Sequence, residues 1–406
     1  MLKKICVCFT ILSYICLYNC NVIADDIDFE SVDSNFVEAV NNDVDELTLN
    51  SRIAVVYDRT SGKVLWGKNE NKRTAMASTT KIMTCIVVIE NCEDLNKEVT
   101  ISKKAGATGG SRLELKANDK ITIKDLLYGL MLRSGNDSAV ALAESIGGSV
   151  ENFANLMNDE AKVLGLNDSH FCTPHGLDNP EHYTTAYELA KLADYALENE
   201  LFAKIVNTKT YTIYINKKPK IIANTNELLG YIEGVNGVKT GFTNNAGRCL
   251  VSSVSRNEFN IITVVLQADT KKIRTSDSIK LINYVYSNYS LINLKEIVDE
   301  KFQEWCLINK NRFTFEKSKD INIDLYYKNL ESNIIPIKNG EKDKIDIKID
   351  CIYNYESPFN KNKMLGNMKV VIDDKIIDSS EIYNKYEIER KNVIDYIKIF
   401  LGVFKF

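Results

Sequence analysis

Ser78 and Lys81 open a stretch, continuing through residues 82–89, that is apolar on nearly every side. A helix that is apolar around its whole circumference is buried. Residues three apart lie on one helix face, one turn apart, so the hydroxyl of Ser78 and the amine of Lys81 are predicted to meet at the start of a buried helix. A serine needs a neighbouring base to become a nucleophile, and burial lowers the pKa of a lysine. The pair therefore suits acyl transfer.

These two residues alone leave a second interpretation open. The S-x-x-K pattern is short, and Ser78 would also serve as a helix N-cap, with Lys81 as a solvated residue of the first turn. Acyl transfer needs further polar partners around the pair, so the remainder of the chain has to decide between the two interpretations.

The first 24 residues predict a secretory signal peptide. Lys3 and Lys4 give a basic start, residues 5–18 are mostly apolar, and Ala24 precedes an acidic stretch. Residues 25–51 carry nine acidic residues and no Lys or Arg, which is typical of a solvated leader. We therefore expect a protein secreted across the cytoplasmic membrane that acts in the cell envelope.

The composition argues against several classes of function. The formal net charge is −4 and no basic stripe is evident, so nucleic acid is not an expected partner. The cysteines form no C-x-x-C pair, which leaves buried thiols as the expectation rather than a zinc ribbon or a redox motif. His170, His175 and His182 lie close in sequence without an H-E-x-x-H pattern, so packing in a loop is favoured over metal binding. We expect neither a metal site nor a cofactor.

Hydrophobic periodicity and turn residues predict a mixed α/β (α+β) domain over residues 52–291. Strands are expected at residues 53–57, 64–66, 234–241, 247–255 and 259–268, and helices at 123–133, 138–146, 155–166, 185–197 and 278–290. The last three strands follow one another with short connections and form an antiparallel meander. The expected architecture is therefore an antiparallel sheet with a helical subdomain.

A polar turn separates two of the predicted helices. Ser134, Gly135, Asn136 and Asp137 stand between apolar segments, and such a turn can aim Ser134 and Asn136 into a cleft. The alternative is an ordinary loop in which Asn136 or Asp137 caps the second helix. Farther along, Gly241 in a glycine-punctuated strand lets another backbone or a ligand approach closely.

The character of the sequence changes after residue 291. Residues 292–385 are rich in Lys, Asn and Ile, with short alternating runs that predict a separate, small all-β domain.

Residues 386–406 predict an amphipathic tail. On a helix from residue 391 onward, the narrow polar stripe consists of Lys391, Asp395, Lys398, Gly402 and Lys405. Such a helix is too short to span a bilayer and suits the outer face of the cytoplasmic membrane, with its axis along the surface. The alternative is a helix packed on its own domain.

Three short motifs stand in a fixed order along the chain: Ser78-Thr79-Thr80-Lys81, Ser134-Gly135-Asn136 and Lys239-Thr240-Gly241. On a buried helix, an interhelical turn and a strand, this combination resembles the low-molecular-mass penicillin-binding proteins, specifically the serine-type D-Ala-D-Ala carboxypeptidases. Residues 237–243 and 182–186 are similar to that family too, as is the order of signal peptide, peptidase domain, β domain and tail. The resemblance implies a penicillin-binding/β-lactamase-like transpeptidase fold.

The resemblance also implies roles for individual residues in a two-step reaction on peptidoglycan stem peptides. Ser78 would attack the penultimate D-Ala, Lys81 would take its proton, and Ser134 would relay protons. β-Lactam antibiotics would acylate the same serine. The substrate-binding residues would be Asn136, Lys239, Thr240, Gly241 and Arg274, although a surface arginine is an equal alternative for Arg274. The backbone N–H groups of Ser78 and Phe242 would form the oxyanion hole.

Two further functions stay open on the sequence. A β-lactamase shares the three motifs, but the class A enzymes use a glutamate-held water for deacylation, and no equivalent is evident in residues 150–190. A β-lactamase also lacks the trailing β domain. A catalytically inert wall-binding protein is the other alternative, and the intact motif residues argue against it.

Overall fold

The computed structural model describes residues 47–402 of the 406-residue chain. The predicted signal peptide and most of the acidic leader lie outside the described residues. The described chain forms two compact units, residues 47–287 and 288–402, whereas the sequence placed the boundary after residue 291.

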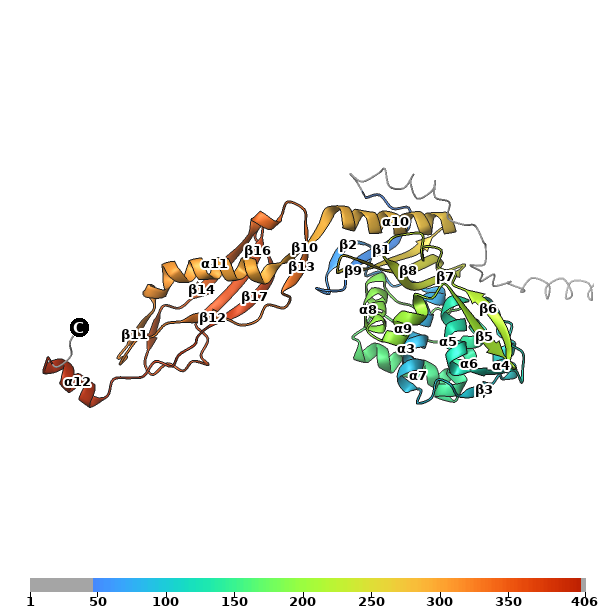
Figure 1. The fold of residues 1–406 in the computed structure, drawn as a ribbon, viewed down its shortest axis with the longest axis horizontal. Coiled ribbons are helices and arrows are strands. Elements are labelled where there is room, and N and C mark those ends of the chain that lie inside the picture. Colours follow the sequence, from blue (N-terminus) through green and yellow to red (C-terminus); the bar gives the residue numbers. More distant parts are fainter. Residues whose placement is uncertain (1–46, 403–406) are drawn as a thin grey trace, which may run out of the picture. The chain divides into compact units, whose positions relative to one another are not determined.

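The first unit is built on a five-stranded antiparallel sheet with the strand order β2-β1-β9-β8-β7. Its strands are β1 (Ile53–Asp58), β2 (Val64–Lys68), β7 (Val235–Thr243), β8 (Gly247–Arg256) and β9 (Phe259–Ala268). All six residues of β1 are buried, because α10 (Lys271–Asn288) covers one face of the sheet and helices cover the other (Figure 1). The strand β7 lies at one edge of this sheet, beside the start of the buried helix.

A helical subdomain fills the other side of the sheet. Its helices are α3 (Lys81–Asn91), α4 (Lys103–Gly106), α5 (Ile123–Leu132), α6 (Asn136–Gly147), α7 (Val150–Val163), α8 (Ala186–Leu197) and α9 (Glu200–Val206). Two hairpins accompany them, β3 (Glu98–Thr100) with β4 (Lys120–Thr122) and β5 (Thr210–Ile215) with β6 (Lys218–Ala223). The first eight residues of α3 are buried, so this helix runs through the core of the subdomain, as its apolar sequence predicts.

The predicted fold class, an antiparallel sheet with a helical subdomain, is confirmed. Two helices start well before the predicted residue, whereas the starts of α6 and α8 lie close to the prediction. The helix α7 begins at Val150 because the side chain of Ser149 accepts a hydrogen bond from the N–H of Asn152 and caps it. The helix α10 begins at Lys271 rather than at residue 278, because its polar first turns are stabilised by tertiary contacts. In one of these, Asp277 accepts hydrogen bonds from the N–H and the hydroxyl of Ser51.

The second unit contains a four-stranded sheet in the order β12-β17-β16-β14 and two small two-stranded sheets. Its strands are β10 (Tyr289–Asn293), β11 (Thr314–Glu316), β12 (Leu325–Tyr327), β13 (Ile334–Lys338), β14 (Ile345–Cys351), β15 (Asn354–Glu356), β16 (Gly366–Ile372) and β17 (Lys375–Asn384). The expected β domain is confirmed, and the structure adds the helix α11 (Leu294–Asn309) to it. Leu294, Val298 and Phe302 recur every four residues and pack into the β core, which is the apolar stripe of a surface helix.

The tail helix is shorter than predicted. The helix α12 spans Val393–Phe400, because Asn392 and Asp395 form a capping box at its start and Gly402 lies in the left-handed region just after its end. The predicted helix of residues 391–406 is therefore wrong in length, and Lys405 lies outside the described residues.

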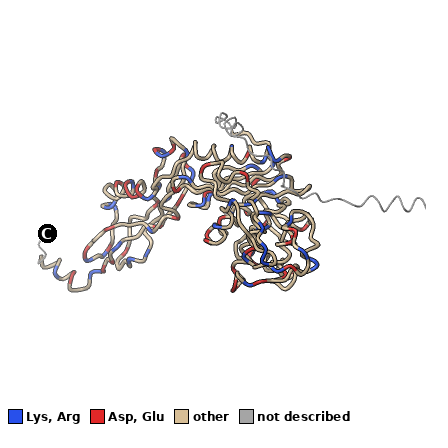
Figure 2. The backbone as a smooth tube through the Cα atoms, turned by 45° about the vertical axis from the view of Figure 1, so that its right-hand side comes forward, with Lys and Arg blue, Asp and Glu red and all other residues tan. Residues whose placement is uncertain are grey.

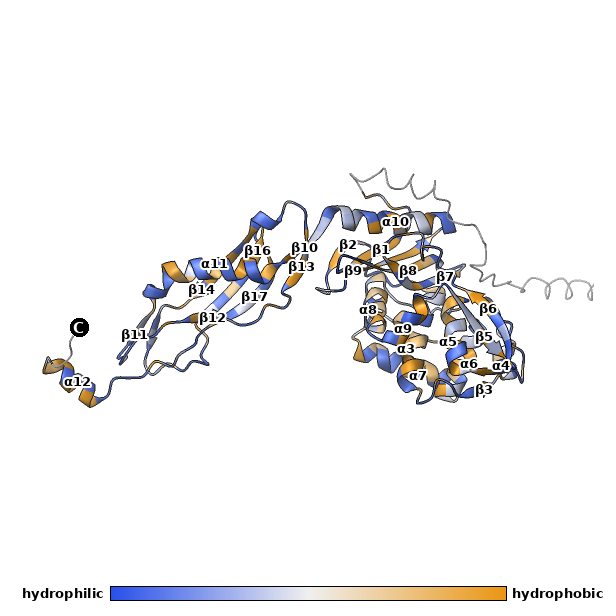
Figure 3. Ribbon diagram, in the orientation of Figure 1, coloured by the Kyte–Doolittle hydropathy of each residue, from blue (hydrophilic) through white to orange (hydrophobic). Residues whose placement is uncertain are grey.

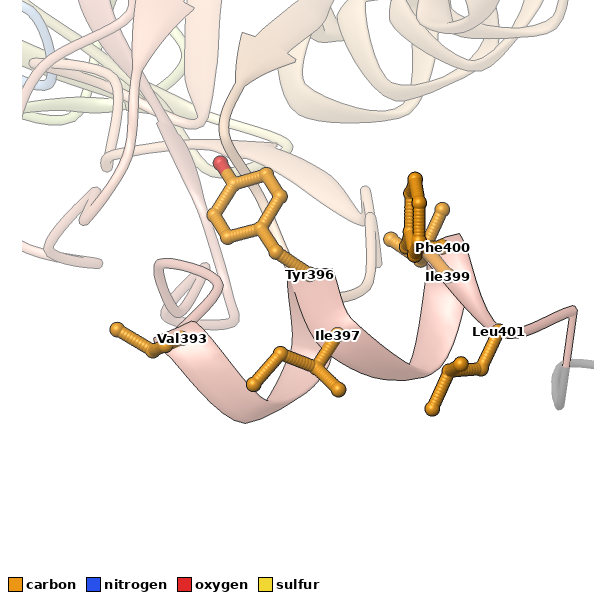
Figure 4. Close-up of a pocket in the computed structure, with 6 residues that line it drawn as sticks. All are labelled: Val393, Tyr396, Ile397, Ile399, Phe400 and Leu401. Atoms are coloured by element: carbon orange, nitrogen blue, oxygen red, sulfur yellow. The ribbon is translucent and has the colours of Figure 1, made fainter.

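The hydrophobic side chains of α12 project from the helix (Figure 4), which is among the most hydrophobic segments of its unit (Figure 3). In residues 47–402, no helix combines the length and hydropathy that crossing a membrane requires.

Acidic and basic residues are interspersed along both units (Figure 2). None of the six cysteines among the described residues forms a disulfide. Cys85 and Cys249 are buried, but the other four keep part of their surface exposed: Cys92, Cys172, Cys306 and Cys351. The expectation of buried thiols therefore holds for two of the six.

Candidate active site

Ser78 and Lys81 meet at the entry to the buried helix. Ser78 lies in a short 3₁₀ turn, η1 (Ala77–Thr80), and α3 starts directly after it. The Nζ of Lys81 lies 2.7 Å from the Oγ of Ser78, and the lysine is completely buried. The alternative of a solvated lysine is thereby wrong, and no side-chain cap is formed at the start of η1 or of α3.

The amine of Lys81 is enclosed by oxygen atoms from three parts of the chain. Besides Ser78, it donates to Asn136 Oδ1 at 2.7 Å and to the carbonyl of His175 at 3.0 Å, and it lies 3.4 Å from Ser134 Oγ. Burial lowers the pKa of Lys81 well below its usual value, and the charge of Lys239 lowers it further, whereas Asp137 acts in the opposite direction. A lysine whose pKa is depressed in this way can accept a proton from a neighbouring hydroxyl.

The turn between α5 and α6 holds Ser134 and Asn136 against this amine. Ser134 has a φ of 59°, a left-handed conformation that is uncommon for a serine and recurs at functional sites. The Nδ2 of Asn136 donates to the carbonyl of Gly109 at 2.7 Å, which fixes the amide so that its oxygen faces Lys81. Gly135 is the N-cap of α6 without any side-chain cap, so the alternative of an Asn136 or Asp137 cap is wrong.

The strand β7 closes the other side of the site. A Cβ on Gly241 would lie 3.0 Å from the N of Ser78 and 3.1 Å from the N of Thr79. Only a glycine therefore lets β7 pass this close to η1 without displacing it. Lys239 is buried and donates to the carbonyl of Thr240 at 2.9 Å. The structure thus brings the three sequence motifs together around Ser78.

Comparisons with known proteins agree with this geometry. Residues 35–270 match the family model described as D-alanyl-D-alanine carboxypeptidase, and residues 314–390 match the C-terminal domain of penicillin-binding protein 5. The D-alanyl-D-alanine carboxypeptidase DacF of Bacillus subtilis is 33% identical over 366 residues, which cover 88% of this chain and 90% of that protein. The chain belongs to the D-alanyl-D-alanine carboxypeptidase family.

Solved structures of this family show the same fold. Penicillin-binding protein 5 from Haemophilus influenzae has a TM-score of 0.66 at 28% identity, covering 84% of this chain and 98% of that one. The DD-transpeptidase of Streptomyces K15 has a TM-score of 0.57 at 35% identity and covers 59% of this chain and 98% of that one. The resemblance inferred from the three motifs is confirmed.

Within this carboxypeptidase fold, Arg274 is buried rather than exposed. It lies in the first turn of α10 with no exposed surface, and its Nη2 forms an ion pair with Glu227. The same carboxylate oxygen accepts a hydrogen bond from Thr275 at 2.5 Å. One residue before Glu227, Asn226 donates to the carbonyl of Gly237 on β7 at 2.9 Å. The alternative of a surface arginine is therefore wrong, and Arg274 anchors the segment that borders β7.

Sequence reasoning gave no role in the site to two acidic residues, Asp137, which it treated as a turn former or helix cap, and Glu227. Asp137 is buried, and its two oxygens accept hydrogen bonds from the N–H groups of Leu113 and Leu115, each at 3.0 Å. Glu227 holds Arg274. Nothing in the sequence shows that either carboxylate is buried or paired, because their partners come from other parts of the chain.

Among the described residues, no group of three or more His, Cys, Asp or Glu side chains is arranged to hold a metal ion. The ring of His182 is buried in the loop before α8, where a hydrogen-bond chain joins it through Thr80 to the carbonyl of Ala77, the residue before Ser78.

Proposed function

We propose that the protein is a serine-type D-Ala-D-Ala carboxypeptidase that removes the terminal D-Ala from peptidoglycan stem pentapeptides. One observation carries this proposal: the buried amine of Lys81, with its depressed pKa, lies 2.7 Å from the hydroxyl of Ser78. This is the arrangement of a nucleophile and its base. Membership of the carboxypeptidase family supports the choice of substrate.

In the first step, Ser78 Oγ attacks the carbonyl carbon of the penultimate D-Ala while its proton passes to Lys81 Nζ. The negative charge on the carbonyl oxygen is stabilised by the N–H groups of Ser78 and Phe242, each of which contributes about 3–4 kcal/mol in comparable sites. The C–N bond then breaks, and the proton held by Lys81 reaches the leaving amine through Ser134. Free D-Ala departs and an ester on Ser78 remains.

In the second step, water hydrolyses that ester. Lys81, neutral again, takes a proton from the water as its oxygen attacks the ester carbonyl. The bond to Ser78 Oγ breaks, the proton returns to Oγ, and the shortened peptide is released. A β-lactam carbonyl enters the same first step, but its ring nitrogen stays tethered to the acyl group, so the protein is expected to bind penicillin covalently.

The substrate's terminal carboxylate is bound by the side of the site formed by β7. Lys239 supplies the positive charge and Thr240 a hydroxyl, which lies 2.9 Å from that of Thr225. Arg274, expected from the sequence as a second carboxylate partner, is buried and paired with Glu227, so we assign it an indirect part in substrate binding, through the segment that it anchors beside β7. Asn136 holds the substrate backbone, and Gly241 leaves room for the peptide beside Ser78.

Measured D-Ala release tests this function. The wild-type protein should release D-Ala from a soluble pentapeptide and retain labelled penicillin on the Ser78 peptide. Ser78→Ala should lose both. Lys81→Arg should lose acylation, because an arginine stays protonated, whereas Lys239→Arg keeps the positive charge and should retain part of the activity. Penicillin labelling that survives Ser78→Ala contradicts the assignment.

The same assays separate the two other functions. A β-lactamase would hydrolyse penicillin with many turnovers and release little D-Ala. An inert wall-binding protein would do neither while still binding peptidoglycan. The family match at residues 314–390, outside the peptidase domain, supports the carboxypeptidase.

We further propose that the protein is secreted and lies on the outer face of the cytoplasmic membrane through α12. The apolar side chains of this helix are exposed, among them Phe400 at 90%, Val393 at 74% and Ile397 at 51% (Figure 4). Only Asp395 is buried among the residues of α12, through its capping box. An exposed apolar helix with a basic residue, Lys398, on its polar side suits the interface of an anionic bilayer.

Flotation with phosphatidylglycerol vesicles tests the membrane proposal. The wild type should float with the vesicles, and Ile397→Asp with Phe400→Asp should abolish flotation without changing D-Ala release from a soluble peptide. The matched control is Glu387→Asp with Glu389→Asp, just before the helix, which keeps charge and should float normally. Unchanged flotation of the Ile397/Phe400 variant contradicts the proposal.

A further inference from the structure

The peptide unit between Ala77 and Ser78 connects the carbonyl of Ala77, which is hydrogen-bonded, to the active site. Its N–H is that of Ser78, a proposed donor of the oxyanion hole. Its carbonyl belongs to Ala77 and, because the unit is planar and trans, points the opposite way. Thr80 Oγ1 donates to this carbonyl at 2.7 Å. A bond that fixes the carbonyl therefore also fixes the direction of the N–H.

His182 extends this hydrogen-bond chain. Its Nε2 lies 2.7 Å from Thr80 Oγ1, and its Nδ1 accepts from the N–H of Cys172 at 2.9 Å. Burial, with a smaller effect from His170, lowers the pKa of His182 to about 4, so the ring is neutral at neutral pH. Because Nδ1 accepts, Nε2 carries the proton and donates to Thr80. The hydroxyl proton of Thr80 is then directed at Ala77.

Two glycines let the chain pack against both sides of the same peptide unit. A Cβ on Gly176 would lie 1.9 Å from the oxygen of Ala77, and a Cβ on Gly241 would lie 3.0 Å from the nitrogen of Ser78. Ala77 itself has a φ of 49°, a conformation that an alanine seldom adopts on its own. Tertiary contacts must therefore hold this peptide unit in place.

We propose that His182 and Thr80 are positioning residues that preset the Ser78 N–H of the oxyanion hole. The chain runs from His182 Nε2–H to Thr80 Oγ1–H and on to the Ala77 carbonyl. Both side chains are buried and act through this peptide rather than on the substrate. The inference rests on the proposed carboxypeptidase function, since it assigns the N–H of Ser78 to the oxyanion.

Variants of Thr80 test the chain directly. Thr80→Val keeps the shape but removes the hydroxyl, and it should lower kcat for D-Ala release by about 10–100-fold, part of the loss expected for a whole oxyanion donor. KM should stay near the wild-type value, because the donor acts on the transition state. Thr80→Ser restores the hydroxyl and should recover most of kcat, which a purely steric role would not predict.

Thr79→Val is the matched control. Thr79 is equally buried and donates to the carbonyl of Met76 at 2.5 Å, which belongs to a peptide unit one residue earlier. Loss of the Thr79 hydroxyl should leave kcat within about threefold of the wild type, because the peptide unit that it holds does not contain a proposed oxyanion donor. An equal loss in the two valine variants overturns the proposal.

Variants of His182 give an independent test, which also decides the matter if Thr80→Val fails to fold. His182→Gln keeps an N–H donor near Thr80 and should retain more kcat than His182→Leu, which has none. Equal kcat for these two variants overturns the proposal.

Failure of the inference and failure of the function are distinguishable. If the wild type is acylated at Ser78 and Thr80→Val keeps the wild-type kcat, the positioning role is wrong and the function stands. If the wild type is not acylated, the function itself is wrong.

Discussion

Gly241→Ala should slow acylation by opening the site between β7 and η1. The new Cβ would lie 3.0 Å from the nitrogen of Ser78 and 3.2 Å from the Cβ of Ala77. Comfortable contacts for a carbon atom begin near 3.5 Å, so the strand and the turn must separate by about 0.5 Å. The two proposed oxyanion donors sit on opposite sides of this contact, on Ser78 and Phe242. An oxyanion placed between them would lose good geometry to at least one donor.

The expected loss of rate follows from what one oxyanion donor contributes to kcat. Losing one entirely lowers kcat about 10²–10³-fold, so a partial displacement should lower it by about 10–100-fold. The φ of Gly241 does not lie in the left-handed region, so an alanine at this position adds no backbone strain through its φ angle. The fold should survive with a nearly unchanged thermal midpoint.

The assay is the acylation rate with a fluorescent penicillin, measured beside D-Ala release. Gly67→Ala is the control: it lies on the opposite edge strand, β2, and the atoms nearest to its new Cβ would be those of the Glu70 carboxylate, at the far end of a flexible side chain. This control should acylate like the wild type. If Gly241→Ala acylates at the wild-type rate, the argument that β7 must pass this close to η1 is refuted.

Three other outcomes are expected. Burial and then the charge of Lys239 depress the pKa of Lys81, so the neutral amine that accepts the proton persists to lower pH than in an ordinary lysine. The acylation rate should therefore fall as the pH falls through that lowered pKa, because the amine becomes charged, and a rate that does not decline at any acid pH at which the protein stays folded contradicts a Lys81 base. Glu227→Gln removes the charged partner of the buried Arg274 and should lower the free energy of unfolding by about 3–5 kcal/mol, measured by denaturant titration; a loss below about 1 kcal/mol contradicts the pairing. Phe302→Ala leaves a cavity between α11 and the β core and should destabilise the second unit by about 3–5 kcal/mol, measured by calorimetry. D-Ala release from a soluble peptide should stay unchanged in the activity assay.

The sequence determined the strands of the main sheet, most of the helices and the contact between Ser78 and Lys81. The all-round apolar stretch after Lys81 requires a buried helix, and the spacing of Ser78 and Lys81 requires them to share a face, so this part follows from local periodicity. The strands of the meander and most helices are likewise encoded by period and turn residues. Helix starts were less accurate where tertiary contacts stabilise a polar turn, as Ser51 does for Asp277 in α10.

Only the tertiary structure decided which groups surround Ser78 and Lys81. The depressed pKa of Lys81 comes first from its burial in the assembled core and then from the charge of Lys239 on a distant strand. The pairing of Arg274 with Glu227 and the chain from His182 to Ala77 also join residues far apart in sequence. Hydrophobic periodicity describes which side of one element is buried, but a hydrogen bond or a charge pair depends on two elements meeting. That meeting is set by the packing of the whole core.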